Sequence, residues 1–110
     1  MHTGTRPMPP VRAPVKTIKW RPRMTMAEQN VVVRSGTDVV FEWDYSHNDV
    51  YMFPSVTAYN KCDFSQATLL SSESGFRFST KSKSGMFYFG CQVYSHCNEG
   101  QKLRLAVTGG

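Results

Sequence analysis

Short β-favouring segments separated by turns run through most of this chain, and this pattern constrains the fold more than any other feature of the sequence. The clearest segment spans residues 37–45. Within it, Val39, Phe41, Trp43 and Tyr45 alternate with mostly polar residues. Alternation with a two-residue period is typical of a strand that has one buried face. We therefore predict a half-buried strand over residues 37–45.

Further segments along the chain have the composition of strands. They are Val15–Trp20, Asn30–Val33, Val50–Phe53, Ala67–Leu70, Gly75–Thr80, Met86–Cys91 and Lys102–Thr108. A helical turn is expected at Ala58–Asp63, and Lys81–Gly85 has the composition of a turn. Because turns are frequent and no long helical period occurs, the sequence predicts an all-β sandwich with at most short helical turns.

The chain of 110 residues has the length of one domain, with 40% hydrophobic and 13% aromatic residues. This composition favours a packed body over disorder. We interpret residues 1–14 as a flexible leader rich in Pro and Arg, and residues 15–108 as the folded domain. No apolar run is long enough to span a bilayer, and the leader lacks the apolar centre of a signal peptide. If the protein is exported, its signal is missing from this sequence.

The formal net charge of +5 is concentrated in the N-terminal third of the chain. Residues 1–34 contain seven basic residues and one acidic residue, Glu28, whereas the rest of the chain contains six basic and seven acidic residues. A basic leader is usually a solvated tail, and no RNA-recognition or zinc-finger spacing accompanies it. We therefore expect no nucleic-acid partner.

Three side chains that can bind a metal follow one another at intervals of five residues: Cys91, His96 and Gln101. This spacing suits one loop folded around one ion. His47, far upstream beside the end of a predicted strand, adds a second imidazole. One thiolate, two imidazoles and one weak oxygen donor are the ligands of a blue-copper electron-transfer centre.

The alternation that ends at Cys91 predicts the direction of its side chain. Phe87, Phe89 and Cys91 fall on one face of the predicted strand. If the two aromatic rings point into the core, the sulfur of Cys91 does so too. A neutral thiol is stable there, whereas a thiolate needs a compensating cation.

The chain has three cysteines, so in an oxidising compartment one pair and one remaining thiol are expected. A bond between Cys62 and Cys97 would tie the loop that carries His96 to a distant segment. It would also leave Cys91 free to bind a metal.

Several short motifs occur along the chain in a characteristic order. They are Ser35-Gly36-Thr37-Asp38, His47-Asn48, Tyr59 with Cys62, and Tyr88-Phe89-Gly90-Cys91 through His96-Cys97 to Gly100-Gln101-Lys102. In this order they resemble the cupredoxins, and specifically the phytocyanin family, over about residues 18–107. The closing motif is the most specific part of the resemblance.

The resemblance implies a Greek-key cupredoxin sandwich that holds one copper ion. Its ligands would be His47, Cys91 and His96, with Gln101 as the axial ligand in the manner of the stellacyanin-like branch. It also implies a disulfide between Cys62 and Cys97. Asp49, inserted where the family usually runs from Asn directly to Val, predicts a local bulge beside His47.

The implied function is that of a type 1 (blue) copper protein, which carries single electrons and has no catalytic residues. His96 is the ligand expected to be exposed, so a redox partner protein or a small-molecule electron donor or acceptor should dock near it, on a rim formed by Val93 and Tyr94. We expect a monomer, without a membrane span in this chain, in an extracellular or other oxidising compartment.

The main alternative is a copper-free or copper-carrying cupredoxin that acts as a recognition or binding module. For a copper carrier, Met24 and Met26 offer a weak Cu(I)-binding pattern, although methionines more often fill a core or a loop. An oxidase with several copper ions requires paired His-x-His motifs. The chain has only His2, His47 and His96, so we do not expect an enzyme.

Overall fold

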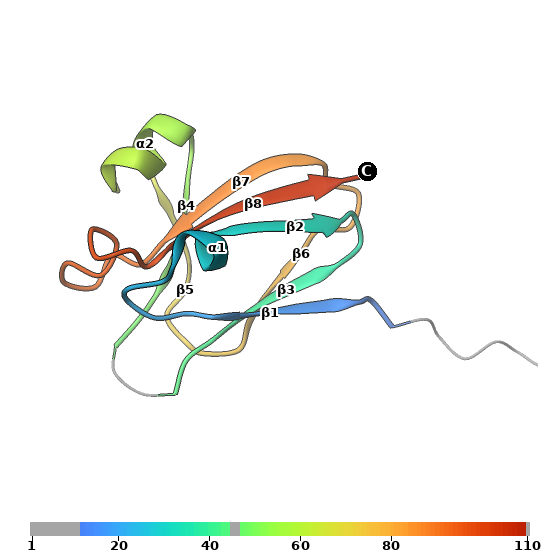
Figure 1. Cartoon of the computed structure of the whole chain (residues 1–110), viewed down its shortest axis with the longest axis horizontal. Helices are drawn as coiled ribbons and strands as arrows, with labels where there is room; N and C mark the ends of the chain where they lie inside the picture. Colours follow the sequence, from blue (N-terminus) through green and yellow to red (C-terminus); the bar gives the residue numbers. More distant parts are fainter. Residues whose placement is uncertain (1–11, 45–46, 110) are drawn as a thin grey trace, which may run out of the picture.

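Two β-sheets form the body of the protein (Figure 1), and the structure, a computed structural model, describes residues 12–44 and 47–109. The three-stranded sheet has the order β1 (Val15–Lys19), β3 (Asp38–Glu42), β6 (Phe76–Ser79). The five-stranded sheet has the order β2 (Asn30–Arg34), β8 (Lys102–Thr108), β7 (Gly85–Gly90), β4 (Val50–Phe53), β5 (Thr68–Ser71). The pairs β1–β3 and β2–β8 are parallel, and the other pairs are antiparallel. The predicted all-β sandwich is confirmed.

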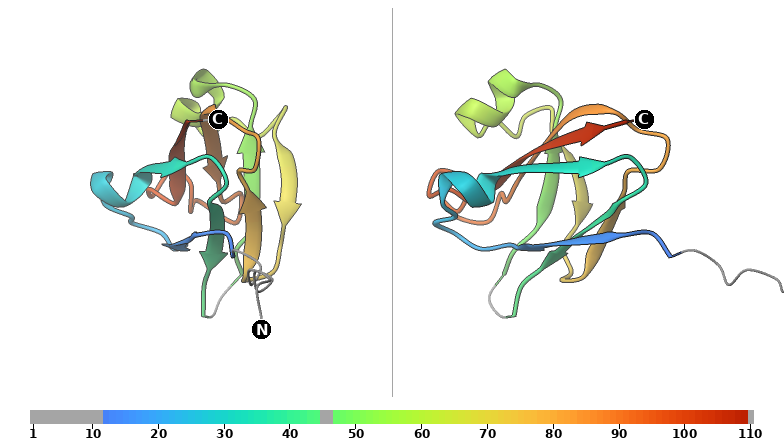
Figure 2. Two further views of the ribbon diagram at one scale, coloured as in Figure 1. Left: turned by 90° about the vertical axis from the view of Figure 1, so that its right-hand side faces the viewer. Right: turned by 45° about the vertical axis from the view of Figure 1, so that its right-hand side comes forward.

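The two sheets have edge strands that can be followed in Figure 2. The edge strands β1 and β2 lie on one side, and β5 lies on the other. Between the sheets, the strands contribute alternate side chains to one apolar core, as the two-residue period predicts. Leu103, Leu105 and Val107 of β8 are buried in this way. In β3, however, Val40 is buried as well as Val39 and Phe41, so that strand is covered on both faces.

Strand β3 ends at Glu42, which is earlier than the sequence predicts. The backbone N–H of Trp43 donates to the side-chain hydroxyl of Ser74 at 2.8 Å. This hydroxyl takes the place of the backbone carbonyl that would accept from Trp43 if the strand continued. Trp43 is partly buried and still packs against the main core. Tyr45, which the alternation places in the same strand, lies outside the described residues.

Helix α1 (Met26–Gln29) is an element that our sequence prediction missed. Thr25 caps its N-terminus: its hydroxyl accepts from the N–H of Glu28, and the Glu28 carboxylate accepts from the N–H of Thr25. This reciprocal pair is a capping box, and its Thr-x-x-Glu signature is present in the sequence. Arg21 forms an ion pair with Glu28 at 3.0 Å.

Helix α2 (Val56–Lys61) occurs near the predicted helical turn but begins two residues earlier. The hydroxyl of Ser55 accepts from the N–H of Ala58 at 3.1 Å and so fixes the start of the helix. The helix ends at Lys61 and is capped by Cys62, whose backbone is left-handed with φ of 49°. Tyr59 and Ala58 pack with Phe53 and Cys97 into a second, smaller core.

The connection between β7 and β8 lies at the end of the sandwich away from the C-terminus, the same end as the two helices (Figure 1). This connection contains the predicted ligands Cys91 and His96. Of the leader predicted for residues 1–14, residues 1–11 lie outside the described part of the chain. Within residues 12–44 and 47–109, no helix is long and apolar enough to cross a membrane.

Candidate metal centre

Cys91 follows the last residue of β7 and is fully buried. Its backbone N–H donates to the carbonyl of Gln101 at 3.1 Å, which closes the base of the connecting loop. Cys91 belongs to the main core together with Phe89, and Phe87 packs against the same core, as the alternation predicts. Burial raises the pKa of the Cys91 thiol to about 11, although the backbone N–H groups of Asp49 and Val93 favour the thiolate. A thiolate here therefore needs a cation beside it.

His96 is held in the loop by backbone hydrogen bonds on both sides. Its N–H donates to the carbonyl of Val93 at 3.0 Å, and its carbonyl accepts from the N–H of Gln101 at 2.9 Å. These bonds bring the Nδ1 atom of the ring to 3.5 Å from the sulfur of Cys91. Tyr94, which is 84% exposed, lies edge-on to the His96 ring with the ring centroids 5.8 Å apart.

Gln101 is fully buried, and the two halves of its amide have different surroundings. The amide nitrogen donates to the Oδ1 atom of Asn48 at 2.9 Å. The amide oxygen, Oε1, is buried and has no hydrogen-bond partner among the described residues. Because an unsatisfied buried acceptor costs about 1–3 kcal/mol, such an atom needs an explanation. A cation that accepts this oxygen as a ligand would provide one.

Asn48 contacts two of the predicted ligands, although the sequence reasoning assigned it no role. It is 5% exposed, and its Oδ1 atom lies 3.7 Å from the sulfur of Cys91 as well as 2.9 Å from the amide nitrogen of Gln101. The only signal for it in the sequence is its place in the His47-Asn48 motif. Asn48 therefore links two of the predicted ligands across a long separation in the chain.

His47, the fourth predicted ligand, is exposed at the surface beside Asn48. Within the described ranges, no three His, Cys, Asp or Glu side chains are grouped so that they could hold a metal ion. The structure thus places Cys91 and His96 in contact and connects Gln101 to Cys91 through Asn48, but it does not gather His47 with them.

Asp49, the inserted residue, connects this segment to two others. Its carbonyl accepts from the indole N–H of Trp20, and its carboxylate accepts from the backbone N–H of Gln92, both at 2.7 Å. The pairing of β4 with β5 shifts register between Val50 and Tyr51, which is the kind of irregularity that the insertion predicts. The inserted residue therefore ties the β3–β4 connection to the start of the Cys91 loop.

A disulfide joins Cys62 to Cys97, the pairing that the family resemblance implies, and leaves Cys91 as the free cysteine. It connects the end of α2 to the residue after His96. Gly90 is required nearby, because a Cβ atom at this position would lie 2.6 Å from the ring of Phe53. The loop is thus fixed at Cys97 by a covalent bond and at its base by close packing.

The donor atoms at this place fit copper. A buried thiol, an imidazole in contact with it and a buried amide oxygen without a partner match the soft, borderline and weak donors of a type 1 site. A family model described as a plastocyanin-like domain matches residues 22–101, a range that includes all four predicted ligands. The chain belongs to the plastocyanin-like domain family.

Solved structures of phytocyanins share the fold of this plastocyanin-like chain. Cucumber stellacyanin with Cu²⁺ has a TM-score of 0.71 and 21% identity, with 89% of this chain and 98% of that chain covered. Cucumber basic protein, a blue copper protein, has a TM-score of 0.71 and 17% identity, with coverage of 84% and 98%. Spinach plantacyanin has a TM-score of 0.66 and 22% identity, with coverage of 86% and 99%. The family match and these phytocyanin structures confirm a plastocyanin-like domain with the fold of the phytocyanins.

No curated protein matches the sequence of this plastocyanin-like chain.

The structure also places the two methionines that were considered for Cu(I) binding. Met24 is buried in the main core, whereas Met26, the first residue of α1, is 74% exposed. The environment of Met24 is therefore that of an ordinary core side chain.

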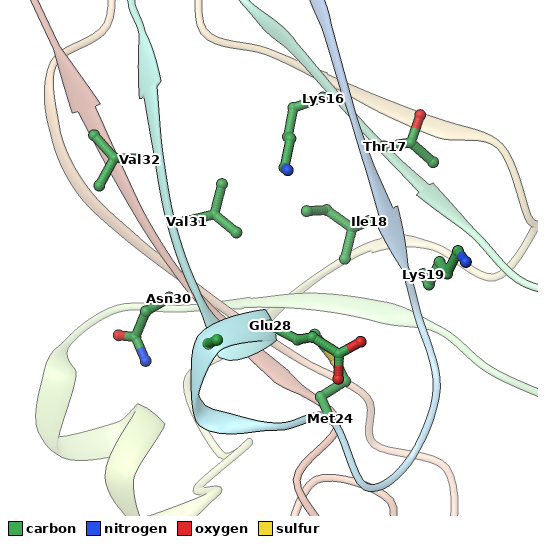
Figure 3. A pocket seen from close by; sticks show the side chains of 10 residues that line it. Lys16, Thr17, Ile18, Lys19, Met24, Glu28, Asn30, Val31 and Val32 are labelled. Atoms are coloured by element: carbon green, nitrogen blue, oxygen red, sulfur yellow. The ribbon is translucent and has the colours of Figure 1, made fainter.

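A groove of about 530 Å³ lies away from the predicted ligands, between the edge strands β1 and β2 and above α1. Figure 3 shows Ile18 and Val31 pointing toward each other across it, with Lys16 beside them. None of the predicted ligands lines this groove. A second hollow of about 390 Å³ reaches Asn48 and is walled by Trp20 and Trp43.

Proposed function

We propose that this protein carries single electrons by means of one copper ion held by His47, Cys91 and His96, with Gln101 as a weak axial ligand. The observation that supports this proposal most is the unpartnered Oε1 atom of Gln101, buried in the same cluster as a free thiol and an imidazole. When bound, the copper ion supplies a centre that alternates between Cu(II) and Cu(I).

The chain's own residues would make this exchange fast. Cys91 would hold the ion as a thiolate, having lost its proton to solvent, and the surrounding apolar core would destabilise that thiolate without the ion. The disulfide at Cys97 and the hydrogen bonds at the base of the loop hold the donors in place. Cys91, His96 and Gln101 would therefore need little rearrangement when the charge of the site changes, and little rearrangement lowers the barrier to electron transfer.

His96 is the proposed point at which electrons enter and leave. Its ring is only partly buried, and the exposed ring of Tyr94 and the partly buried Val93 lie beside it. A redox partner protein, or a small electron donor or acceptor, would dock on this rim. We further propose that the chain acts as a monomer in an extracellular or other oxidising compartment, where its disulfide is stable.

Titration of the metal-free protein with Cu(II) tests the proposal. We expect an intense blue thiolate-to-copper absorption band that saturates at one equivalent and is absent from Cys91→Ala. The matched control is Gln92→Ala, a change of the exposed neighbouring side chain, which should keep the band. A wild-type protein that stays colourless with excess Cu(II) would exclude the electron-transfer role.

A copper-free binding module is the second candidate, and the exposed position of His47 favours it. In that case the hydrogen-bonded cluster around Asn48 would serve only to stabilise the loop. The same titration separates the two functions, because a binding module would give neither a blue band nor saturation at one equivalent.

A further inference from the structure

We propose that Asn48 is a positioning residue that orients the amide of Gln101, so that the amide oxygen and not the nitrogen remains available as the axial donor. This inference deepens the proposed function and rests on it. It concerns a residue that lies next to a predicted ligand in the chain but is not itself one of the four.

The orientation follows from the hydrogen-bonding capacity of the two side chains. The Oδ1 atom of Asn48 can only accept, and the amide nitrogen of Gln101 donates to it at 2.9 Å. If the Gln101 amide were turned by 180°, its oxygen would face Oδ1, and two acceptors would repel each other. The buried NH₂ group would also lose this acceptor. With the amide of Asn48 in its observed orientation, this hydrogen bond therefore selects one of the two orientations of the Gln101 amide.

The selected orientation determines what Gln101 can bind. An amide oxygen carries lone pairs and can approach a cation, whereas the NH₂ group presents hydrogens and cannot. Oε1 is the atom that has no partner among the described residues. The geometry thus leaves a buried lone-pair donor in the cluster that contains Cys91 and His96.

Asn48 also contacts the sulfur of Cys91, because Oδ1 and Sγ are 3.7 Å apart. In the metal-free protein this oxygen can accept from the thiol. The same acceptor atom therefore contacts two of the proposed ligands.

A structural role alone would also make Asn48 sensitive to mutation. Asn48 is buried and has at least one interaction besides these two, so a change in stability cannot identify its role. A double-mutant cycle with Gln101 can, because a residue that acts through Gln101 has no further effect once Gln101 is replaced.

The first experiment measures the side-chain NH₂ group of Gln101 by ¹⁵N NMR in the metal-free protein. Its hydrogen exchange should be about tenfold faster in Asn48→Ala than in wild type, as expected for the loss of one ordinary hydrogen bond. Asn48→Asp, which keeps an oxygen acceptor, should retain slow exchange. Unchanged exchange in Asn48→Ala would overturn the proposal. In the wild type, an absence of nuclear Overhauser contacts between this NH₂ group and Asn48 would overturn it too.

The second experiment compares the electron paramagnetic resonance spectra of the Cu(II) forms of wild type, Asn48→Ala, Gln101→Leu and the double variant. We expect Asn48→Ala to change the copper hyperfine splitting when Gln101 is present and to have no further effect when residue 101 is Leu. Equal changes in both backgrounds would reject a role through Gln101. If wild type forms no blue site, the proposed function fails, while the amide measurement still decides whether Asn48 orients Gln101.

Discussion

The amide oxygen of Gln101 is buried without a hydrogen-bond partner among the described residues, so replacing this residue tests its role directly. Gln101→Met should raise the reduction potential of the copper-loaded protein, because an amide oxygen stabilises Cu(II) more than a thioether sulfur does. Cyclic voltammetry of the two proteins measures the difference. The side chains of Met and Gln have similar length, so the packing of the site should change little.

The control for this substitution is Gln92→Met at an exposed position in the same loop. Its potential should equal that of the wild type. If Gln101→Met has the same or a lower potential than the wild type, Gln101 is not an axial ligand.

Single residues also mark where sequence reasoning reaches its limit. The spacing of Cys91, His96 and Gln101 suggests them as ligands, which stays a prediction, and alternation gives the inward direction of Cys91. The contact between Asn48 and Gln101 joins residues 53 positions apart, and no local pattern encodes it. The exposed position of His47 belongs to the β3–β4 connection, and no strand or helix pattern in the sequence encodes it.

The disulfide between α2 and the ligand loop should be a major contributor to stability. The bond joins cysteines that are 35 residues apart in the sequence. In the chain-entropy model, restricting the unfolded chain in this way stabilises the folded protein by about 3–4 kcal/mol. Cys62→Ser combined with Cys97→Ser should lower the free energy of unfolding by about this amount in urea titrations of the metal-free protein.

Reduction of the disulfide provides the control for this prediction. A reductant such as dithiothreitol should lower the stability of the wild type to that of the double variant and leave the double variant unchanged. Equal stability of oxidised wild type and double variant would show that the bond does not hold the loop against α2.

Helix α1 depends on its cap, since four residues cannot form a stable helix by propensity alone. Thr25→Ala removes the hydroxyl that accepts from the N–H of Glu28, and we expect a loss of about 1 kcal/mol. Thermal unfolding measures the loss. Thr25→Ser, which keeps the hydroxyl, should restore most of the stability, and failure to do so would contradict the capping explanation.

The acidic member of the same capping box predicts a pH dependence. The backbone N–H of Thr25, with a smaller contribution from Arg21, holds the pKa of Glu28 below its ordinary value of 4.5. A lowered folded-state pKa stabilises the protein above the unfolded-state pKa, and this contribution is lost as the pH falls through the folded-state pKa. Carboxyl ¹³C NMR should find Glu28 titrating below 4.5, and Glu28→Gln should remove this part of the acid sensitivity.

The helices and strands differ in how far the sequence predicts them. The alternation of Leu103, Leu105 and Val107 with less buried residues runs along the whole of β8. The sequence therefore predicts this strand with its observed bounds. Helix α1 is too short to show a helical period, so only its Thr-x-x-Glu cap signals it. Strand β3 ends early because a hydroxyl of Ser74 takes the N–H of Trp43, which is a tertiary contact.

For the molecule as a whole, the formal net charge of +5 should control encounters with small redox reagents. Oxidation of the copper-loaded protein by the anion hexacyanoferrate(III) should slow by about tenfold as ionic strength rises from 10 mM to 0.5 M. A cationic cobalt(III) oxidant should show the opposite trend. Stopped-flow absorbance measures both rates, and equal salt dependence for the two reagents would contradict electrostatic steering by this charge.

The whole fold is more predictable than the arrangement of its ligands. The strand pattern and the closing motif led to the sandwich, which the family match and the shared fold confirm. The proposed ligands come from two connections, with His47 between β3 and β4 and the other three between β7 and β8. Composition and periodicity describe strands, and they contain little information on how two connections meet.

Cys91, His96, His47 and Gln101 are the four residues proposed to hold one copper ion. Anomalous diffraction at the copper absorption edge, from crystals grown with one equivalent of Cu(II), tests this proposal most directly. We expect a single strong peak within bonding distance of the Cys91 sulfur and one nitrogen each of His96 and His47, with the Gln101 oxygen as its next neighbour. A peak at any other place, or a peak near Cys91 with His47 still turned to solvent, would contradict the proposed ligand set.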